Sequence, residues 1–399
     1  MLAVLLLSSS AVCRRAPADR AAGGSATTVP NPPSPLVLSG SITTRVVIGA
    51  HRVVAVTDDV IVKAGGQLEL GPGTVVRVSR GKVVLVNGGQ LIARGTDADV
   101  VRFTSSAERP GPGDWVGVVI DSSDLAARRG SRWPRSIMEH ALVEYAGGLR
   151  VGDASRGLAG GVVLSGYSGF VDGESSAAGL DLTSVEIRDC ATRGLDALSD
   201  ARVVWKDLHF GANGGVSARV SAELVVGLGS APTEAVELSG IVRKPLTLPA
   251  VSHPYIVGDL LRVGSFEKEA PALLTIPPGT ILKFRRRAGI RAGGHGYGGI
   301  IAHGTTFTSA ETPAMPGDWR GISILVNGSV DLDGSTVEFS GEDGLPAVDY
   351  GAAERDVKIR ETAFKNNGGP AIGAPRSCKR WNGASLANSS HGQPICRAL

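Results

Sequence analysis

The two stretches that decide the fold are Leu70-Gly-Pro-Gly-Thr-Val-Val-Arg-Val78 and Ile276-Pro-Pro-Gly-Thr-Ile-Leu-Lys-Phe284. Each places a Pro-Gly pair directly before a short apolar run that is interrupted by a single cation. Pro followed by Gly favours a tight turn, and a run that alternates after it favours a strand with one buried face. Because the same unit occurs twice, we interpret the chain as an internal duplication.

Further matching segments extend the duplication over most of the chain. The pairs are Phe103-Thr-Ser-Ser-Ala-Glu108 with Phe307-Thr-Ser-Ala-Glu311, Pro112-Gly-Asp-Trp-Val-Gly117 with Pro316-Gly-Asp-Trp-Arg-Gly321, and Val143-Glu-Tyr-Ala-Gly147 with Val337-Glu-Phe-Ser-Gly341. We divide the chain accordingly into an export signal with a Pro/Ala/Ser/Thr-rich linker, a first half, a second half, and a C-terminal cap or tail. The boundaries are 1–35, 36–235, 236–375 and 376–399.

Composition favours strands and turns over helices. The chain has 55 Gly and 22 Pro among 399 residues, beside 8 Phe, 5 Trp and 5 Tyr. Short β-branched runs such as Val60-Ile-Val62 and Val83-Val-Leu-Val86 are bounded by Gly, Pro, Asn or Asp. A β-sandwich also has short strands, but units such as Ala363-Phe-Lys-Asn-Asn-Gly-Gly369, a strand followed by an Asn-rich and Gly-rich corner, favour a coil of parallel strands.

Two predictions about packing follow from a coil. The inward side chains of successive coils must stack into one core, so we expect burial of Val76, Val78, Phe103, Leu282, Phe284 and Phe307. We also expect the two halves to stack end to end without a flexible linker. Residues 220–250 keep the strand-like runs Leu224-Val-Val226 and Val236-Glu-Leu238, where a linker would be polar.

Several stretches of the second half resemble a known family. Pro254-Tyr-Ile-Val-Gly-Asp-Leu-Leu-Arg-Val263, Gly299-Ile-Ile-Ala-His-Gly304 and Pro316-Gly-Asp-Trp-Arg-Gly-Ile322 resemble bacterial secreted right-handed parallel β-helix repeat proteins of the pectin-lyase-like superfold. The resemblance covers roughly residues 38–375, although the first half lacks the Pro-Tyr pair. It implies an all-β, right-handed parallel β-helix. It implies little about activity, because this fold hosts lyases, hydrolases, adhesins and structural surface proteins.

The N-terminus is typical of an exported protein. A short apolar run ends in small residues before Cys13 and is followed by Arg14 and Arg15. Cys13 lies where the acylated cysteine of a lipoprotein would lie, although Val12 stands where a small residue is preferred. A lipid anchor and an ordinary cleaved signal both remain open. In either case we expect a secreted protein, or one held at the cell surface or on the periplasmic side of the envelope, with no transmembrane span.

Charge gives little support to a nucleic-acid partner. The chain has 41 Lys and Arg against 38 Asp and Glu, a formal net charge of +3. The outward positions Arg77, Lys283 and Arg285 form a possible ligand face for acidic glycans or another cell-envelope component. The alternative is a solvated strand face without a ligand.

Acidic residues do not form a recognisable catalytic pattern, and no catalytic residue is assigned. Asp58 and Asp59 are adjacent, so on a strand they would point to opposite faces. Asp331 and Asp333 would share a face, and Asp333-Gly334 faintly resembles a calcium loop, against which a solvated turn is the simpler interpretation.

The Gly-Asp-Trp motifs and the histidines favour a structural interpretation. We expect Asp114 and Asp318 to cap backbone N–H groups, and Trp115 and Trp319 to cover the core unless they are exposed to stack on a sugar. The seven His residues show no metal-ligand spacing, so we expect neither a metal nor a cofactor.

The cysteines near the C-terminus predict a cap. A solenoid must cover its last coil, and an exported chain can close a loop between Cys378 and Cys396 with a disulfide, worth roughly 3 kcal/mol. A tail with two free thiols is the alternative, which mass spectrometry of the unreduced protein decides. Cys190 has no obvious partner and is expected to be buried and reduced.

Two functions from different classes are compatible with these features. The first is an exported or cell-surface β-helix that acts, as a monomer and without catalysis, as a structural or adhesin-like binding module, with a glycan as one candidate ligand. The second is a polysaccharide lyase or glycoside hydrolase of the β-helix type. A cleft with converging carboxylates and a basic residue would favour the enzyme, and its absence would favour the binding module.

Overall fold

The computed structural model describes residues 34–121, 134–148, 160–165, 179–197, 202–228, 235–350 and 357–373. Within these ranges the regular structure is almost entirely β-strand, as predicted. The described helices are two short 3-10 segments, η2 (Ala222–Leu228) and η3 (Glu342–Gly344). Neither is long and apolar enough to cross a membrane.

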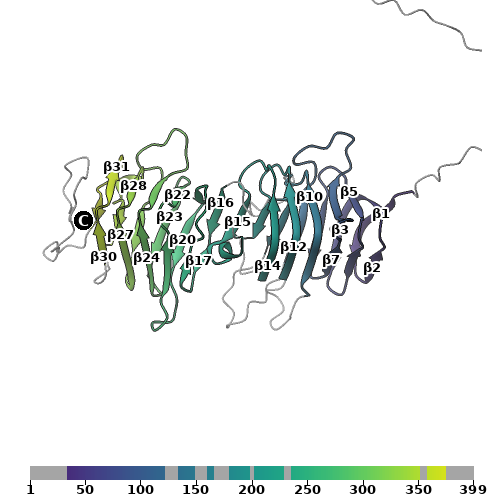
Figure 1. The fold of residues 1–399 in the computed structure, drawn as a ribbon, viewed down its shortest axis with the longest axis horizontal. Coiled ribbons are helices and arrows are strands. Elements are labelled where there is room, and N and C mark those ends of the chain that lie inside the picture. The colour runs from purple at the N-terminus through teal and green to yellow at the C-terminus, as the bar shows by residue number, and fades with distance from the viewer. Residues whose placement is uncertain are drawn as a thin grey trace, which may run out of the picture. The chain divides into compact units, whose positions relative to one another are not determined.

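Every pairing between the strands that the structure describes is parallel, and most strands pair with their equivalent one coil further along the chain. Figure 1 shows the strands of neighbouring coils side by side, in an order that follows the colour from purple to yellow. Three short strands per coil make this parallel pairing possible without crossover helices.

The first half contains two ladders that do not continue into the second half. One contains β1 (Leu36–Ile42), β3 (Val53–Lys63), β5 (Val75–Val78), β8 (Val101–Ser105), β10 (Ser136–Glu144), β12 (Gly179–Arg188) and β14 (Arg202–Phe210). The other contains β2 (Arg45–Ile48), β4 (Gln67–Leu70) and β7 (Gln90–Arg94), and joins the first part of β10. The longer strands β10, β12 and β14 therefore belong to both ladders.

A third ladder, called here the long ladder, runs through both halves. It starts from the last parts of β1 and β3. It then contains β6 (Val83–Asn87), β9 (Gly117–Asp121), β11 (Val162–Ser165), β13 (Leu195–Ala197), β15 (Ala218–Ser221), β16 (Val236–Ser239), β19 (Tyr255–Val257), β22 (Ile281–Phe284), β25 (Thr306–Ser309), β28 (Thr336–Glu338) and β31 (Ala363–Lys365). Because β16 pairs with both β15 and β19, the two halves are joined by continuous strand pairing, as predicted.

Two further ladders complete the coils of the second half. One contains β17 (Ile241–Val242), β20 (Leu260–Val263), β23 (Gly289–Ala292), β26 (Ile322–Ile324), β29 (Val348–Asp349) and β32 (Ile372–Gly373). The other contains β18 (Leu246–Thr247), β21 (Ala272–Ile276), β24 (Gly298–His303), β27 (Gly328–Asp333) and β30 (Val357–Arg360).

The core lies inside the coils and is made of alternate strand residues. The residues predicted to point inward are all at most 2% exposed: Val76, Val78, Phe103, Leu282, Phe284 and Phe307. Trp115 and Trp319 are fully buried, which excludes a sugar-stacking role for either in this structure. The alternation of buried and exposed residues along each strand is therefore the main determinant of the fold.

One strand prediction was wrong. Leu224–Val226, expected to be strand-like, lies in the 3-10 helix η2. Ala222, Val225 and Leu228 are buried while Val226 is 54% exposed, so burial repeats every third residue, the period of a 3-10 helix. This helix packs against β14, β15 and β17, where the first-half ladder that ends in β14 stops.

The duplication is also present in the backbone. Gly113 and Gly317, which precede the two Asp-Trp pairs, both have φ of 86°. Gly73 and Gly279, the turn glycines of the two stretches quoted first, have φ of 68° and 77°. A residue with a side chain is strained at such positive φ values, so these turns require glycine in both halves. Cys13, Cys378 and Cys396 lie outside the described residues, and the predicted disulfide stays a prediction.

Candidate functional site

Glu144, the last residue of β10, is a fully buried carboxylate of the first half. Its neighbour Val143 points into the core, so Glu144 points to the outer side of the sheet. The carboxylate is nevertheless fully buried, because Arg102 of β8 and Arg188 of β12 lie over it with 43% and 38% of their side chains exposed. The parallel register places Glu144 directly opposite Arg188 on the next coil.

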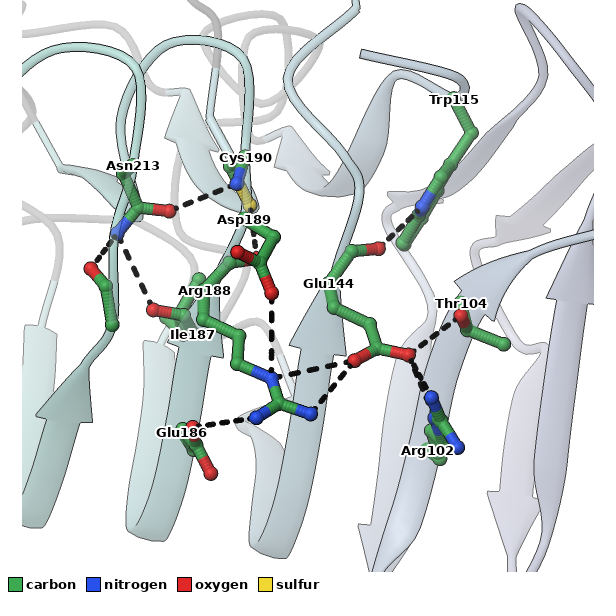
Figure 2. A network of polar contacts seen from close by, with 11 residues as sticks. Arg102, Thr104, Trp115, Glu144, Glu186, Ile187, Arg188, Asp189, Cys190 and Asn213 are labelled. Atoms are coloured by element: carbon green, nitrogen blue, oxygen red, sulfur yellow. Dashed lines mark hydrogen bonds and ion pairs between the residues drawn. The ribbon is translucent and has the colours of Figure 1, made fainter. Parts of the chain in front are cut away.

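The Glu144 cluster is defined here as Arg102, Thr104, Glu144 and Arg188 (Figure 2). The Thr104 hydroxyl donates to Oε1 of Glu144 at 2.7 Å, and Arg102 donates to the same oxygen through Nε at 2.7 Å and through Nη2. Arg188 donates to the other oxygen, Oε2, through Nη2 at 3.1 Å and through Nε at 3.4 Å. Both carboxylate oxygens are therefore occupied by donors from two neighbouring coils.

The cluster keeps Glu144 ionised. Burial alone would raise its pKa, but the hydrogen bonds from Thr104, Arg102 and Arg188 outweigh burial and hold the pKa below its ordinary value. For Arg188, burial alone would lower the pKa. The hydrogen bond to Glu144 outweighs burial, so the pKa of Arg188 lies above its ordinary value. A general acid needs a raised pKa at neutral pH, so Glu144 is unsuited to that role.

Two further carboxylates lie at the rim of the cluster. Arg188 also lies 3.5 Å from an oxygen of Glu186 and 3.6 Å from an oxygen of Asp189. Two arginines therefore face three carboxylates. The Trp115 indole N–H donates to the backbone carbonyl of Glu144 at 2.9 Å, which fixes the end of β10 against the core.

The corner next to the cluster is held by Asn213 (Figure 2). Its side-chain oxygen accepts from the backbone N–H of Cys190 at 3.0 Å, and its amide nitrogen donates to the carbonyl of Gly211 at 3.0 Å. Cys190 is buried and free, as predicted, and burial raises the pKa of its thiol to about 12. A thiol in this state is a poor nucleophile, so the corner is structural.

A second group of buried charges, the junction cluster, joins the two halves. It consists of Arg193, Asp196, Arg219, Glu237 and Arg285. Arg219 Nε donates to Asp196 at 2.9 Å, while Arg193 lies 3.4 Å and Arg285 lies 3.3 Å from the same oxygen of Glu237. Asp196 is fully buried and Glu237 has 6% of its side chain exposed. The two carboxylates are thus paired with arginines from both halves.

The three cations of the predicted ligand face lie on two different ladders. Arg77 is an exposed residue of β5 in the first half, and no ion-pair partner for it lies in the described ranges. Lys283 is half-buried on β22 of the long ladder, and Arg285 follows that strand. Arg285 belongs to the junction cluster, so its charge is shared with Glu237.

The Gly-Asp-Trp motifs have the structural role that the sequence predicted. Oδ2 of Asp114 accepts from the backbone N–H of Gly111 at 2.9 Å and from the Ser105 hydroxyl at 2.7 Å. Oδ2 of Asp318 accepts from the backbone N–H of Met315 at 2.8 Å and from Ser309 at 2.6 Å. Both aspartates therefore close the turn that leads into the next strand.

The remaining acidic pairs are also held by neighbours. Asp331 and Asp333 share a face, as predicted, and Arg360 bridges them at 3.0 Å and 3.1 Å. Asp58 and Asp59 lie in β3, where Asp58 pairs with Lys82 at 2.8 Å and Asp59 accepts from the backbone N–H of Val83 at 3.3 Å. In the part of the chain that the structure describes, no group of three or more His, Cys, Asp or Glu side chains is arranged to hold a metal.

Neither the Glu144 cluster nor the junction cluster was predicted from the sequence. Glu144 stands in the repeated Val-Glu segment, but nothing local shows that it is buried. Its partners Arg102 and Arg188 are 42 and 44 residues away along the chain, and the register of three coils brings them together. The sequence signal that could have predicted the Glu144 cluster is a Glu in one repeat unit together with arginines at outward strand positions of other units.

Comparison with known proteins agrees with this architecture. Residues 40–185 match a family model described as a pectate-lyase-like beta helix domain. Neither a search of curated proteins nor a search of solved structures finds a significant match to the chain. With its parallel ladders, the chain is therefore a parallel β-helix protein, and its residues 40–185 are similar to a pectate-lyase-like beta helix domain.

Proposed function

We propose that the protein acts, without catalysis, as an exported or cell-surface structural and binding module. The observation that supports this proposal is the state of its buried carboxylates. Among the described residues five acidic side chains are buried: Asp114, Glu144, Asp196, Glu237 and Asp318. Each has an arginine nitrogen within 4 Å, so each is already engaged in an ion pair within the protein.

Polysaccharide hydrolysis needs two carboxylates that flank the scissile bond, one of them protonated. In the Glu144 cluster a single fully buried carboxylate has both of its oxygens occupied by Thr104, Arg102 and Arg188. In the junction cluster the arginines again take the carboxylate oxygens. These groups therefore join coils, and a sugar ring would have to displace the arginines to reach them.

Export is supported by the N-terminal sequence, in which a short apolar run precedes Cys13 and a Pro/Ala/Ser/Thr-rich linker follows. Whether Cys13 is acylated decides between a secreted and an anchored protein. Cell fractionation with a Cys13→Ser variant tests this: an anchored protein moves from the membrane to the soluble fraction, and a secreted protein does not change its fraction.

The main test is a panel of neutral and acidic glycans and cell-wall polymers incubated with the purified full chain. We expect binding to some polymers without new reducing ends and without the ultraviolet absorbance of unsaturated products. Heat-denatured protein is the matched control for background product. Time-dependent release of either product by the native protein overturns the proposal and establishes the lyase or hydrolase alternative.

A further inference from the structure

A third group of cations lies on the ladder formed by β20, β23 and β26, apart from both clusters described above. Arg262 of β20 pairs directly with Arg291 of β23, and Arg291 pairs with Ser323 of β26. The strand neighbours of the two arginines are at most 1% exposed: Leu261, Val263, Ile290 and Ala292. Strand alternation therefore directs both guanidinium groups and the serine hydroxyl to the outer side.

These polar groups have no protein partners in the described part of the chain. Neither Arg262 nor Arg291 makes an ion pair or a side-chain hydrogen bond there, and the same holds for the Ser323 hydroxyl. The Nε atom of Arg291 is buried and has no hydrogen-bond acceptor. Like charges directly opposite each other on neighbouring strands are destabilising, and a buried donor without an acceptor adds to the cost. Both costs are removed by an anion that lies over the ladder.

The surroundings add further positive charge. Arg320, which precedes β26, and Arg287, which precedes β23, share the carboxylate of Glu342 at 3.3 Å and 3.4 Å. One carboxylate thus serves two arginines. Gly289 of β23 lies beside them, and a Cβ atom at this position would come within 3.2 Å of the Cβ of Arg320. The ladder continues from Ser323 to Asp349, so the cationic part ends at Ser323.

The equivalent ladder of the first half has no charge at these positions. By the duplication, Arg262, Arg291 and Ser323 correspond to Ile61, Leu85 and Val119. The coils of the first half therefore fold with apolar residues at these outward positions. Stability of the fold does not require the two arginines, which separates them from the arginines of the Glu144 cluster.

The chemistry of the three groups defines the ligand. They are donors from neighbouring coils about 4.8 Å apart, and each guanidinium presents a fork of parallel N–H groups. A carboxylate has two oxygens and one charge, which suit one guanidinium. A tetrahedral oxyanion has enough acceptors to engage both arginines and the hydroxyl together.

We propose that Arg262, Arg291 and Ser323 bind the sulfate or phosphate ester group of a polysaccharide. This assignment rests on the proposed function as a binding module and identifies the class of ligand. Sulfate and phosphate esters share the tetrahedral geometry, so the experiment has an arm for each.

The test is isothermal titration calorimetry of the full chain with dextran sulfate, dextran phosphate, polygalacturonate and uncharged dextran at low ionic strength. The variants are Arg262→Gln and Arg291→Gln, each compared with Lys63→Gln, which removes the same charge from an exposed strand position at the end of β3 in the first half. Far-UV circular dichroism establishes that all three variants are folded. We expect dextran sulfate or dextran phosphate to bind, and either ladder variant to weaken it about tenfold, as for the loss of one charge-assisted hydrogen bond.

Lys63→Gln is expected to leave the affinity unchanged within about twofold, as for a charge outside the site. Binding of only one ester supports the assignment and identifies the ester. The assignment is overturned if neither ester binds, if Lys63→Gln weakens binding as much as the ladder variants, or if polygalacturonate binds as tightly as the esters. If the calorimetry overturns this assignment and no polysaccharide product is formed, the proposed non-catalytic function still stands. If product is formed, that function is overturned, whatever Arg262 and Arg291 bind.

Discussion

Glu144 and Glu338 occupy the same place in the two halves of the chain and have different surroundings. Each follows an inward valine at the end of its strand and accepts a hydrogen bond from the threonine of the preceding coil, at 2.7 Å from Thr104 and 2.8 Å from Thr308. Glu144 also binds two arginines and is buried. Glu338 is half-buried and has no ion-pair partner in the described residues.

The difference comes from two substitutions between the halves. Thr306 stands where the first half has Arg102, and Lys365 stands opposite Glu338 where Arg188 stands opposite Glu144. A lysine lacks the planar fork that makes a bidentate contact with a carboxylate. The same coil geometry therefore accommodates either a closed ionic cluster or an open polar surface, and the outward residues decide between them.

The largest effect is expected in the core, where the halves also differ. The Trp319 ring stacks on Phe284 at 4.0 Å between centroids with 8° between the planes, whereas the first half has Val78 in place of Phe284. Replacing Trp115 or Trp319 by Ala should each cost about 3 to 5 kcal/mol, with Trp319→Ala costing about 0.5 to 1.5 kcal/mol more through the lost ring contact. Urea unfolding followed by circular dichroism measures both. Val226→Ala at an exposed position is the control, and an equal or larger cost for Trp115→Ala would contradict the comparison.

The next effect concerns the two glutamates. Glu144→Gln leaves two arginines facing a neutral amide and should destabilise the protein by about 2 to 3 kcal/mol, while Glu338→Gln should cost less than about 1 kcal/mol. Arg102→Thr, which reproduces the residue of the second half, should fall between them because Arg188 remains. Free energies of unfolding in urea test the order. If the two Gln variants cost the same, the arginines do not stabilise Glu144.

The pH dependence of the free energy of unfolding provides a further test of the role of Glu144. The pKa of Glu144 in the folded protein lies below its ordinary value, so the native state binds fewer protons than the unfolded chain. Its stabilising contribution is fully present above the unfolded pKa of about 4.3 and is lost as pH falls through the lower folded pKa. The difference in unfolding free energy between the native sequence and Glu144→Gln should therefore be constant near neutral pH and shrink below about pH 4.3. A difference that grows on acidification would exclude this role for Glu144.

The smallest effect is expected at the corners. The backbone N–H of Cys190 donates to Asn213, and that of Ser340 donates to Asn367 at 2.9 Å. The Ser340 hydroxyl also donates to Asn367 at 2.8 Å, so Cys190→Ser should cost less than about 1 kcal/mol because a serine can make the same bond. With its pKa raised to about 12, the thiol of Cys190 should resist iodoacetamide at pH 8 in the native protein and react after unfolding. Rapid native labelling, read by mass spectrometry, would show that the corner is open.

The coil architecture was predictable because its determinants are local. The Pro-Gly turn before Val76 and Leu282 and the alternation after it lie within a few residues, and both give buried positions in the structure. The turn role of Asp114 and Asp318 was predictable for the same reason, since each accepts from a backbone N–H only three residues away. The 3-10 helix at Leu224–Val226 was missed because a short apolar run fits either a period of two or a period of three.

The sequence by itself determined the strands, their inward residues and the duplication, because turn chemistry and burial are encoded in short segments. Only the tertiary structure decided which outward side chains meet. Thr104 and Glu144 are 40 residues apart in the chain, whereas the equivalent pair, Thr308 and Glu338, spans 30 residues. The lengths of the corners between strands vary from coil to coil, so spacing in the sequence does not reveal the register. Stacking of the coils sets that register through parallel pairing, and it thereby places the charged clusters and the ladder of Arg262 and Arg291 on the outer surface.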